Sequence, residues 1–358
     1  MTTRTPNFSA GPAVLPLGVL EEAHAEWFAY QDAGASILEI SHRSKHYTAV
    51  AESARESLRR LLGLDAKWHI LFLQGGASQQ FYQVPLNLLP PKGYAGYVNT
   101  GVWSTKAIAE VARLGEHYIA ATSEADGFDH VVPDDAWDVR DGSAYVHFTS
   151  NNTIHGTQYA IDPRTAGIPL VCDMSSDFLS RPIELDRYGL IYAGAQKNLG
   201  PAGLCLVLIH DDLLQRRNEK LPTLLDYGTH TAKLFHTPPV FAVWLVEKVL
   251  RWIERQGGLV TMGQRNRAQA RRVYDAIDRH DLYVGHARPD SRSTMNVTFG
   301  IEDAALEARL LAEAAKAGLN GLKGHRSIGG LRASIYNATP DASIDALVSF
   351  LDDFASRA

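Results

Sequence analysis

The sequence has few cysteines and no long apolar run, and both shortages exclude classes of protein. Among 358 residues only two are cysteines, Cys172 and Cys205, and each lies inside an apolar segment. Two such residues cannot build a disulfide scaffold. No stretch of about 18 apolar residues is present, so we expect no membrane-spanning helix and no membrane partner. The N-terminus also has no apolar core of a signal peptide, and we therefore expect a cytoplasmic protein.

The sequence also lacks an excess of positive charge. It has 35 Lys and Arg residues against 40 Asp and Glu residues, which gives a formal net charge of −5. Because no basic run is long enough to follow a nucleic-acid backbone, we expect no nucleic-acid partner. Net charge averages over the whole surface, however, so it does not exclude local binding of small anions.

Short apolar segments alternate with segments of helical periodicity through the first two thirds of the chain. The apolar segments end in small or polar residues, and they are WHILFLQGG, GYAGYVNTG, SAYVHFTSNN, IPLVCDMSS, YGLIYAGAQK and GLCLVLIHD. The periodicity predicts helices over residues 17–30, 49–62, 79–88, 103–113 and 240–256. Near-continuous apolar strands between helices are typical of a mostly parallel sheet covered on both faces. The pattern therefore predicts an α/β fold.

The character of the sequence changes after Gly257 and Gly258. Amphipathic helices are predicted over residues 259–279, 304–317 and 343–355, with short apolar runs between them. We therefore predict three parts: an N-terminal segment (1–15) that packs near the active site, a large domain (16–258) and a smaller α+β domain (259–358). The Gly- and Pro-rich loop over residues 226–239 is expected to leave the globular body.

Lys197 has the strongest local signal for chemistry. It lies between two apolar segments, among glycines and other small residues. Burial at the edge of a sheet disfavours an ammonium, lowers its pKa and makes the amine nucleophilic, so such a lysine can form a Schiff base. Alternatively, the lysine caps the end of a strand and keeps its head group in solvent.

Three further positions are compatible with a phosphorylated, flat-ring cofactor. A carboxylate at Asp173 can pair with a cationic ring nitrogen, although Asp after a strand more often caps a turn or helix. The turn from Gly75 to Ser78 can place backbone N–H groups around a phosphate. Trp103 can stack on a ring, or it can be a core residue. The glycine-rich turn matches neither the dinucleotide nor the P-loop motif.

Two clusters of basic residues point to capture of small anions. The segment His42 to His46 is one, and His325 and Arg326 with Arg332 form the other. Such donors suit carboxylates and phosphates, and a solvated basic surface is the alternative interpretation. His42 and His46 have the spacing of a metal pair, but no H-E-x-x-H motif or nearby cysteine supports it, so we predict no metal site.

Taken together, these residues and their flanking segments resemble the phosphoserine aminotransferases, a family of class V aminotransferases within the fold-type I pyridoxal-phosphate enzymes. Eight segments resemble family signatures in the family's order along the whole chain. They are NFSAGPA from Asn7, EISHRSKHY from Glu39, GGASQQF from Gly75, SNNTIHGT from Ser150, DMSSDFLSRP from Asp173, AGAQKNLGPAG from Ala193, HTPPVFA from His236 and GHRSIGGLRASIYNA from Gly324.

The resemblance implies a mostly parallel seven-stranded sheet with a smaller C-terminal domain, and pyridoxal 5'-phosphate as cofactor. The implied activity is amino transfer from glutamate to 3-phosphohydroxypyruvate in serine biosynthesis, and the family often accepts 4-phosphohydroxythreonine of pyridoxine biosynthesis. The implied catalytic residues are Lys197, as the Schiff-base lysine, and Asp173. The implied cofactor-binding residues are Ala77, Ser78, Trp103, Thr153, Asp173, Gln196, Lys197, His236 and Thr237. The implied substrate-binding residues are Ser9, His42, Arg43, His325, Arg326 and Arg332, with Arg332 for the α-carboxylate.

One departure from the family pattern concerns the segment from His236 to Pro239. The family usually has Asn where this chain has His236, and the segment resembles one that reaches the cofactor phosphate of the partner subunit. Imidazole can still donate a hydrogen bond, so phosphate binding is expected to survive. If the loop crosses between subunits, the protein is a homodimer with shared active sites.

Two other interpretations compete with the aminotransferase. A related pyridoxal-phosphate lyase such as a cysteine desulfurase needs a cysteine on a mobile loop, whereas Cys172 and Cys205 both lie in predicted strands. A cofactor-binding protein without catalysis is disfavoured because Lys197, Asp173 and both anion clusters are present. The sequence does not rank the serine-pathway and pyridoxine-pathway substrates.

Overall fold

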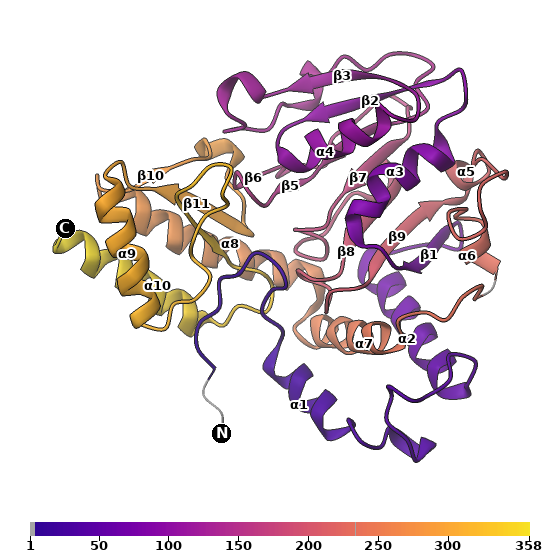
Figure 1. Cartoon of the computed structure of the whole chain (residues 1–358), viewed down its shortest axis with the longest axis horizontal. Coiled ribbons are helices and arrows are strands. Elements are labelled where there is room, and N and C mark those ends of the chain that lie inside the picture. Colours follow the sequence, from indigo (N-terminus) through magenta and orange to yellow (C-terminus); the bar gives the residue numbers. More distant parts are fainter. Residues whose placement is uncertain (1–3, 233) are drawn as a thin grey trace.

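The structure is a computed structural model that describes residues 4–232 and 234–358. A seven-stranded sheet forms the centre of its larger part (Figure 1). In spatial order the strands are β1 (Trp68–Leu73), β9 (Cys205–His210), β8 (Tyr188–Gly194), β7 (Leu170–Asp173), β4 (Val146–Thr149), β2 (Tyr94–Asn99) and β3 (Glu116–Thr122). Strand β9 is antiparallel to both of its neighbours, and the other pairs are parallel. The predicted α/β fold is confirmed.

Both faces of this sheet are buried, which explains why its strands are apolar almost without interruption. In β1, for example, Ile70 and Phe72 enter one hydrophobic core and Leu71 and Leu73 enter the other. Helices cover both cores. They are α1 (Leu17–Ala25), α2 (Lys45–Leu62), α3 (Gly76–Leu88), α4 (Val102–Val111), α5 (Asp211–Leu214), α6 (Thr229–Ala232) and α7 (Val240–Arg255).

The predicted helices are confirmed, with ends shifted by a few residues. Helix α2 starts at Lys45, four residues before the predicted start, because Ser44 caps it by accepting a hydrogen bond from the Tyr47 amide at 3.2 Å. Gly63 ends it with a φ of 71°, as expected of a glycine C-cap. Helix α1 is shorter than predicted and ends at Ala25.

The C-terminal part of the chain has its own core. Helices α8 (Gly258–Asp278), α9 (Ala304–Lys316) and α10 (Asp341–Ser356) pack with an antiparallel sheet of β10 (Val284–Gly285), β11 (Asn296–Gly300) and β12 (Leu331–Ser334). A short hairpin of β5 (Asn151–Asn152) and β6 (Thr157–Gln158) projects from the large domain toward this part (Figure 1). The boundaries 15/16 and 258/259 stay predictions.

The N-terminal segment runs along the junction between the two parts (Figure 1). Phe8 is fully buried in the core of the small domain, and the Ala13 amide donates to the Gln196 carbonyl at 2.9 Å. The start of the loop over residues 226–239 is packed, because Tyr227 is fully buried and donates to Gln80 Oε1 at 2.6 Å, whereas Leu234 and Phe235 further along are exposed. Among the described helices, none is long and apolar enough to cross a membrane.

Candidate active site

Four side chains singled out in the sequence stand at the carboxyl ends of neighbouring parallel strands. Trp103 follows β2, Thr153 follows β4, Asp173 ends β7 and Lys197 follows β8. These strands are adjacent in the sheet in the order β8, β7, β4, β2. Ligands of open α/β sheets bind in the crevice outside these strand ends, so the topology alone brings the four residues to one place.

Lys197 is buried, and its amine is held in the site. Only 9% of the residue is exposed, and Nζ donates a hydrogen bond to Thr153 Oγ1 at 2.7 Å. Burial lowers the pKa of Lys197 to about 8; the Asp173 carboxylate opposes this shift and the Arg332 guanidinium adds to it. The alternative of a strand-capping lysine with its head group in solvent is therefore excluded.

Asp173 is buried at the end of β7 and uses one oxygen to hold the following turn. Its Oδ1 accepts hydrogen bonds from the Ser175 amide at 3.0 Å and from Ser175 Oγ at 2.6 Å. Burial raises the pKa of Asp173, while the Ser175 hydroxyl and the nearby Lys197 ammonium lower it. Among the described residues, no hydrogen bond to Oδ2 is found. The turn-capping role and the ring-nitrogen role are thus compatible, one for each oxygen.

Trp103 stands beside Lys197 in the first turn of α4. Lys197 Nζ lies 5.8 Å from the centre of its indole ring, which is half-buried. Gly101, which precedes α4, leaves room for Asn152 and His155, because a Cβ there would lie 2.6 Å from Asn152 Oδ1 and 3.1 Å from His155 Nδ1. Trp103 is therefore a wall of the site and not an enclosed core residue.

The first turn of α3 supplies a set of backbone donors. Gly75 and Gly76 have φ values of 86° and 66°, which turn the chain sharply from β1 into the helix. Ala77 and Ser78 lie in this turn, where the amides have no partner within the helix and the helix dipole favours an anion. These residues fit the phosphate of a cofactor.

Gln196 and the N-terminal segment close one side of the site. The Gln196 side chain lies against Gly194, where a Cβ would be 2.6 Å from Oε1. A Cβ on Gly11 would lie 3.6 Å from Lys197 Cγ, so the N-terminal segment reaches the lysine itself. Ser9 lies further away beside the small domain, where a Cβ on Gly321 would contact its Oγ at 2.7 Å.

Arg332 of the small domain lies near Lys197, and His325 and Arg326 lie near Arg332. Arg332 is partly buried on β12 and donates from one terminal nitrogen to the Thr153 carbonyl at 3.4 Å, while its buried Nε has no partner. Burial lowers the pKa of His325, and the positive charges of Arg332, Arg326 and Lys106 lower it further. Because Arg332 and Arg326 both act on His325, these two guanidinium groups lie close enough together to receive an anionic ligand.

Among the described residues, no hydrogen bond or ion pair joins His42, Arg43, His236 or Thr237 to Lys197 or Arg332. His42 and Arg43 precede α2, and burial together with the positive charges of His230 and His42 lowers the pKa of His236. By contrast, the charges that act on Lys197 are those of Asp173, Arg332 and Asp177. The predicted site residues therefore fall into two groups within one chain.

The other members of the His42 to His46 segment form surface contacts. Lys45 Nζ lies 2.8 Å from Asp32 Oδ2, and His46 Nε2 lies 2.6 Å from Asp32 Oδ1. For Lys45 the solvated basic surface is the correct interpretation, because the pair is exposed. His46 is engaged by a carboxylate, so it does not pair with His42 around a metal in this structure.

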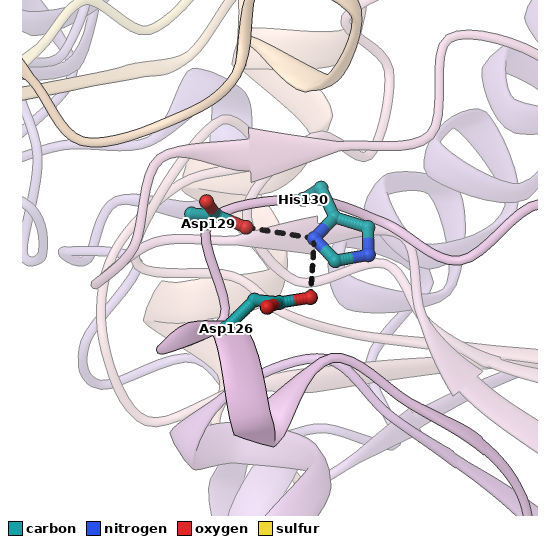
Figure 2. Close-up of side chains that lie close together, drawn as sticks. All are labelled: Asp126, Asp129 and His130. Atoms are coloured by element: carbon teal, nitrogen blue, oxygen red, sulfur yellow. Dashed lines mark hydrogen bonds and ion pairs between the residues drawn. The ribbon is translucent and has the colours of Figure 1, made fainter.

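One cluster elsewhere has the residue types of a metal site (Figure 2). His130 Nδ1 lies 2.7 Å from Asp129 Oδ1 and 3.9 Å from Asp126 Oδ2. Arg288 of the small domain already pairs with both carboxylates, at 3.0 Å from Asp129 and 3.3 Å from Asp126. We interpret the cluster as an ion-pair contact between the domains.

Comparison with known proteins identifies the family. The sequence matches the aminotransferase class-V family over residues 6–347. It is 50% identical to the phosphoserine aminotransferase of Desulfosudis oleivorans, over 99% of each chain. It is 47% identical to the phosphoserine aminotransferase of Bacillus circulans subsp. alkalophilus, whose structure superposes over 100% of each chain with a TM-score of 0.97. The chain belongs to the phosphoserine aminotransferase family.

The crystal structure of the phosphoserine aminotransferase of Trichomonas vaginalis, with pyridoxal phosphate bound, is also similar. It is 38% identical, with a TM-score of 0.92, and the match covers 97% of this chain and 99% of that chain. Pyridoxal phosphate is the cofactor of class V aminotransferases and hence of this phosphoserine aminotransferase family member. The predicted cofactor and transaminase class are confirmed.

The residues of this chain fit that cofactor. Trp103 and the buried Asp173 carboxylate lie near the Lys197 amine, and the α3 amides provide a place for a phosphate. Thr153 Oγ1 stands within hydrogen-bond distance of the amine. Lys197 would hold the cofactor, Asp173 would pair with its ring nitrogen, and Ala77 and Ser78 would bind its phosphate.

The lowered pKa of Lys197 makes a testable prediction for the cofactor-free phosphoserine aminotransferase. Only the neutral amine reacts with an electrophile, so pulse labelling with acetic anhydride should reach half its maximal rate at Lys197 at a pH of about 8. Peptide mass spectrometry across a pH series measures this, with exposed Lys220 as the internal reference. A half-maximal rate near the ordinary value of 10.5 would contradict the description of the site.

Sequence reasoning missed Lys106 and Ser175. Lys106 lies three residues after Trp103 on α4, and its Nζ stands 4.5 Å from the centre of the indole ring, so helical spacing was the available signal. Ser175 lies two residues after Asp173, the spacing of a side chain to backbone turn, and donates from both its amide and its hydroxyl. Neither residue carries a distinctive signal without its neighbour.

Proposed function

We propose that this protein transfers an amino group from glutamate to 3-phosphohydroxypyruvate, which gives O-phosphoserine and 2-oxoglutarate in serine biosynthesis. We propose further that it accepts 4-phosphohydroxythreonine of pyridoxine biosynthesis. One observation carries this: a buried lysine of lowered pKa, next to a buried carboxylate, faces a cluster of cations. The names and solved structures of its relatives support the same activity.

Lys197 is the group that moves the proton. Pyridoxal phosphate, when bound, supplies an electron sink for the electron pair left at the substrate α-carbon. Near pH 8 a large share of Lys197 is neutral, so Nζ can accept a proton from the α-carbon and return it to another carbon. Thr153 Oγ1 accepts a hydrogen bond from Nζ and so limits where the amine can point.

Asp173 acts on the charge of the cofactor ring nitrogen, and Arg332 acts on the charge of the substrate carboxylate. The buried Asp173 carboxylate favours a proton on the cofactor ring nitrogen, which strengthens the electron sink. Arg332 has an unsatisfied buried Nε and a terminal nitrogen on the Thr153 carbonyl, so it can bind the substrate α-carboxylate close to Lys197. His325 and Arg326 are left to bind the substrate phosphate.

Both substrates carry a carboxylate, but only the keto acid and its product carry a phosphate. Arg326→Ala should therefore raise KM for 3-phosphohydroxypyruvate about ten- to a hundredfold and change KM for glutamate much less. Steady-state kinetics with each substrate measure this, and unphosphorylated hydroxypyruvate is the matched control substrate. Wild-type enzyme that turns over the two keto acids equally well would contradict the proposed substrate.

We propose that the active enzyme is a homodimer with shared active sites. The interactions of the site residues support it, since His42 acts on His236 while the groups that act on Lys197 are Asp173, Arg332 and Asp177. Large apolar side chains are exposed on the segments flanking these residues, as expected of a subunit interface. They are Trp27, Phe28, Leu38, Leu234 and Phe235.

Shared sites predict complementation between two defective variants. Lys197→Ala removes the central amine, and His42→Ala with Arg43→Ala removes donors on the other group. If each site takes one group from each subunit, co-expressed variants form heterodimers with one intact site, and activity should return to about a quarter of the wild-type value. Each variant alone is the control. Activity of the mixture equal to the sum of the two variants would contradict shared sites.

A cytoplasmic location and a catalytic role without cysteine complete the proposal. Both cysteines are free and fully buried, and burial raises the pKa of each thiol. Unpaired thiols fit a reducing compartment. Buried strand thiols also offer no nucleophile to a bound substrate, which disfavours the desulfurase interpretation.

A further inference from the structure

We infer that the side chains of Asn151 and Asn296 form a positioning pair that presets Arg332 at its place opposite Lys197 before any substrate binds. The inference rests on the proposed function only for the identity of the carboxylate that Arg332 receives. It concerns two residues of different domains, and among the described residues neither side chain forms a hydrogen bond with Lys197. Both are at most 1% exposed.

The two amides meet at the junction between the domains. Asn151 opens the β5–β6 hairpin of the large domain, and Asn296 opens β11 of the small domain. Asn151 Nδ2 donates to Asn296 Oδ1 at 2.8 Å and to Ser176 Oγ at 2.8 Å. Ser293 Oγ donates to Asn151 Oδ1 at 2.5 Å. Every polar atom of the Asn151 side chain is therefore used, and a flipped amide would place its Oδ1 against Asn296 Oδ1, an acceptor against an acceptor.

From Asn296 the hydrogen bonds lead to the strand that carries Arg332. Asn296 Nδ2 donates to Ser334 Oγ at 3.0 Å and to Tyr336 Oη at 3.2 Å. Ser334 is the register partner of Asn296 between β11 and β12, and it lies two residues after Arg332. Tyr336 in turn donates to the Ala10 carbonyl of the N-terminal segment at 2.7 Å.

From Asn151 the chain leads to the lysine. Two residues further along lies Thr153, whose hydroxyl accepts from Lys197 Nζ at 2.7 Å and whose carbonyl accepts from Arg332 at 3.4 Å. One residue thus touches both the proton-transfer group and the carboxylate-binding group. The Asn151–Asn296 pair holds the two backbones on either side of that contact.

The hairpin is anchored to the large domain independently of this pair. The Ser150 amide donates to the Asp173 carbonyl at 3.0 Å, and Gln158 Nε2 donates to Asp177 Oδ2 at 3.0 Å. Loss of the Asn296 side chain should therefore leave Thr153 in place and loosen the β11–β12 strands. A buried site tolerates displacements of only a fraction of an ångström. Loosening of β12 should therefore displace the Arg332 side chain from its place opposite Lys197.

The test measures binding of 2-oxoglutarate to the holoenzyme by titration calorimetry. This ligand has both carboxylates of glutamate but no amino group, so it binds the pyridoxal form without turnover. Asn296→Ala should weaken binding at least about tenfold, while affinity for pyridoxal phosphate stays within about twofold. Asn151→Ala should weaken 2-oxoglutarate binding similarly. The double variant should bind 2-oxoglutarate no more weakly than the weaker-binding single variant, because both substitutions remove the same Asn151–Asn296 hydrogen bond.

Asn266→Ala is the matched control. Asn266 is also buried between the domains and donates to the Ser180 carbonyl at 2.9 Å and to Asn337 Oδ1 at 2.8 Å, but it reaches neither Thr153 nor Arg332. The Asn266→Ala variant should lose stability as the Asn296→Ala variant does, but it should bind 2-oxoglutarate with the wild-type affinity. Equal weakening in the two variants, or none in Asn296→Ala, would overturn the inference. Wild-type enzyme that fails to bind 2-oxoglutarate would instead contradict the proposed function.

Discussion

Lys197→Ala is expected to remove the visible absorbance band of the lysine-bound cofactor and to reduce amino transfer by at least about 10³-fold. The reason is the position of the Lys197 amine. The Lys197 amine stands beside Thr153, Asp173 and Trp103, and alanine has nothing to replace it. Absorbance spectra and rapid-mixing kinetics with glutamate measure the two effects.

Lys106→Ala is the matched control for this experiment. It removes another lysine beside the same indole ring, with Nζ 4.5 Å from the ring centre, compared with 5.8 Å for Lys197. The Lys106 variant should keep the visible band and the glutamate half-reaction. An unchanged spectrum and full turnover in Lys197→Ala would rule out the assigned role of the lysine.

Asp173→Asn is expected to reduce amino transfer by about 10²- to 10³-fold while the protein stays folded and binds cofactor. The amide keeps the shape of the carboxylate but loses the negative charge that favours a protonated ring nitrogen. A second effect follows inside the chain itself. Asp173 raises the pKa of Lys197 against burial, so its neutralisation should move the acetylation midpoint of Lys197 below pH 8.

Asp177→Asn is the control that distinguishes the specific role of the Asp173 carboxylate from a general loss of negative charge near Lys197. Asp177 is as buried as Asp173 and also raises the pKa of Lys197, but its carboxylate is occupied by Ser150 and Gln158. It should shift the acetylation midpoint of Lys197 in the same direction and lower turnover much less than Asp173→Asn does. Equal losses of turnover in the two variants would show that Asp173 has no specific partner in the reaction.

Sequence reasoning located best those site residues that come directly after, or at the end of, a predicted strand. Lys197, Asp173 and Trp103 each follow a recognisable apolar segment, and parallel strands carry their carboxyl ends to a common edge. Local pattern and topology therefore agree at these positions. The geometry of Thr153, which joins Lys197 to Arg332, could not be inferred, because it depends on how the small domain meets the large one.

The rest of the site depends on contacts between segments far apart in the chain. Asn151 and Asn296 are separated by 145 positions, and nothing in either segment indicates that their amides pair. The Gly and Pro content of residues 226–239 predicted a loop that leaves the globular body, but the ring of Tyr227 at the start of this loop is fully buried. The separation of His42 and His236 from Lys197 is likewise a property of the whole fold, and it is what suggests the shared site.

The central claim is that one site carries out both halves of an amino transfer. Its most direct test mixes wild-type holoenzyme with glutamate alone, removes the products, and then adds 3-phosphohydroxypyruvate, while absorbance reports the cofactor. We predict stoichiometric conversion of the cofactor to its amine form with release of 2-oxoglutarate, followed by its full return with release of O-phosphoserine. No conversion by glutamate, or conversion that the phosphorylated keto acid does not reverse, would contradict the claim.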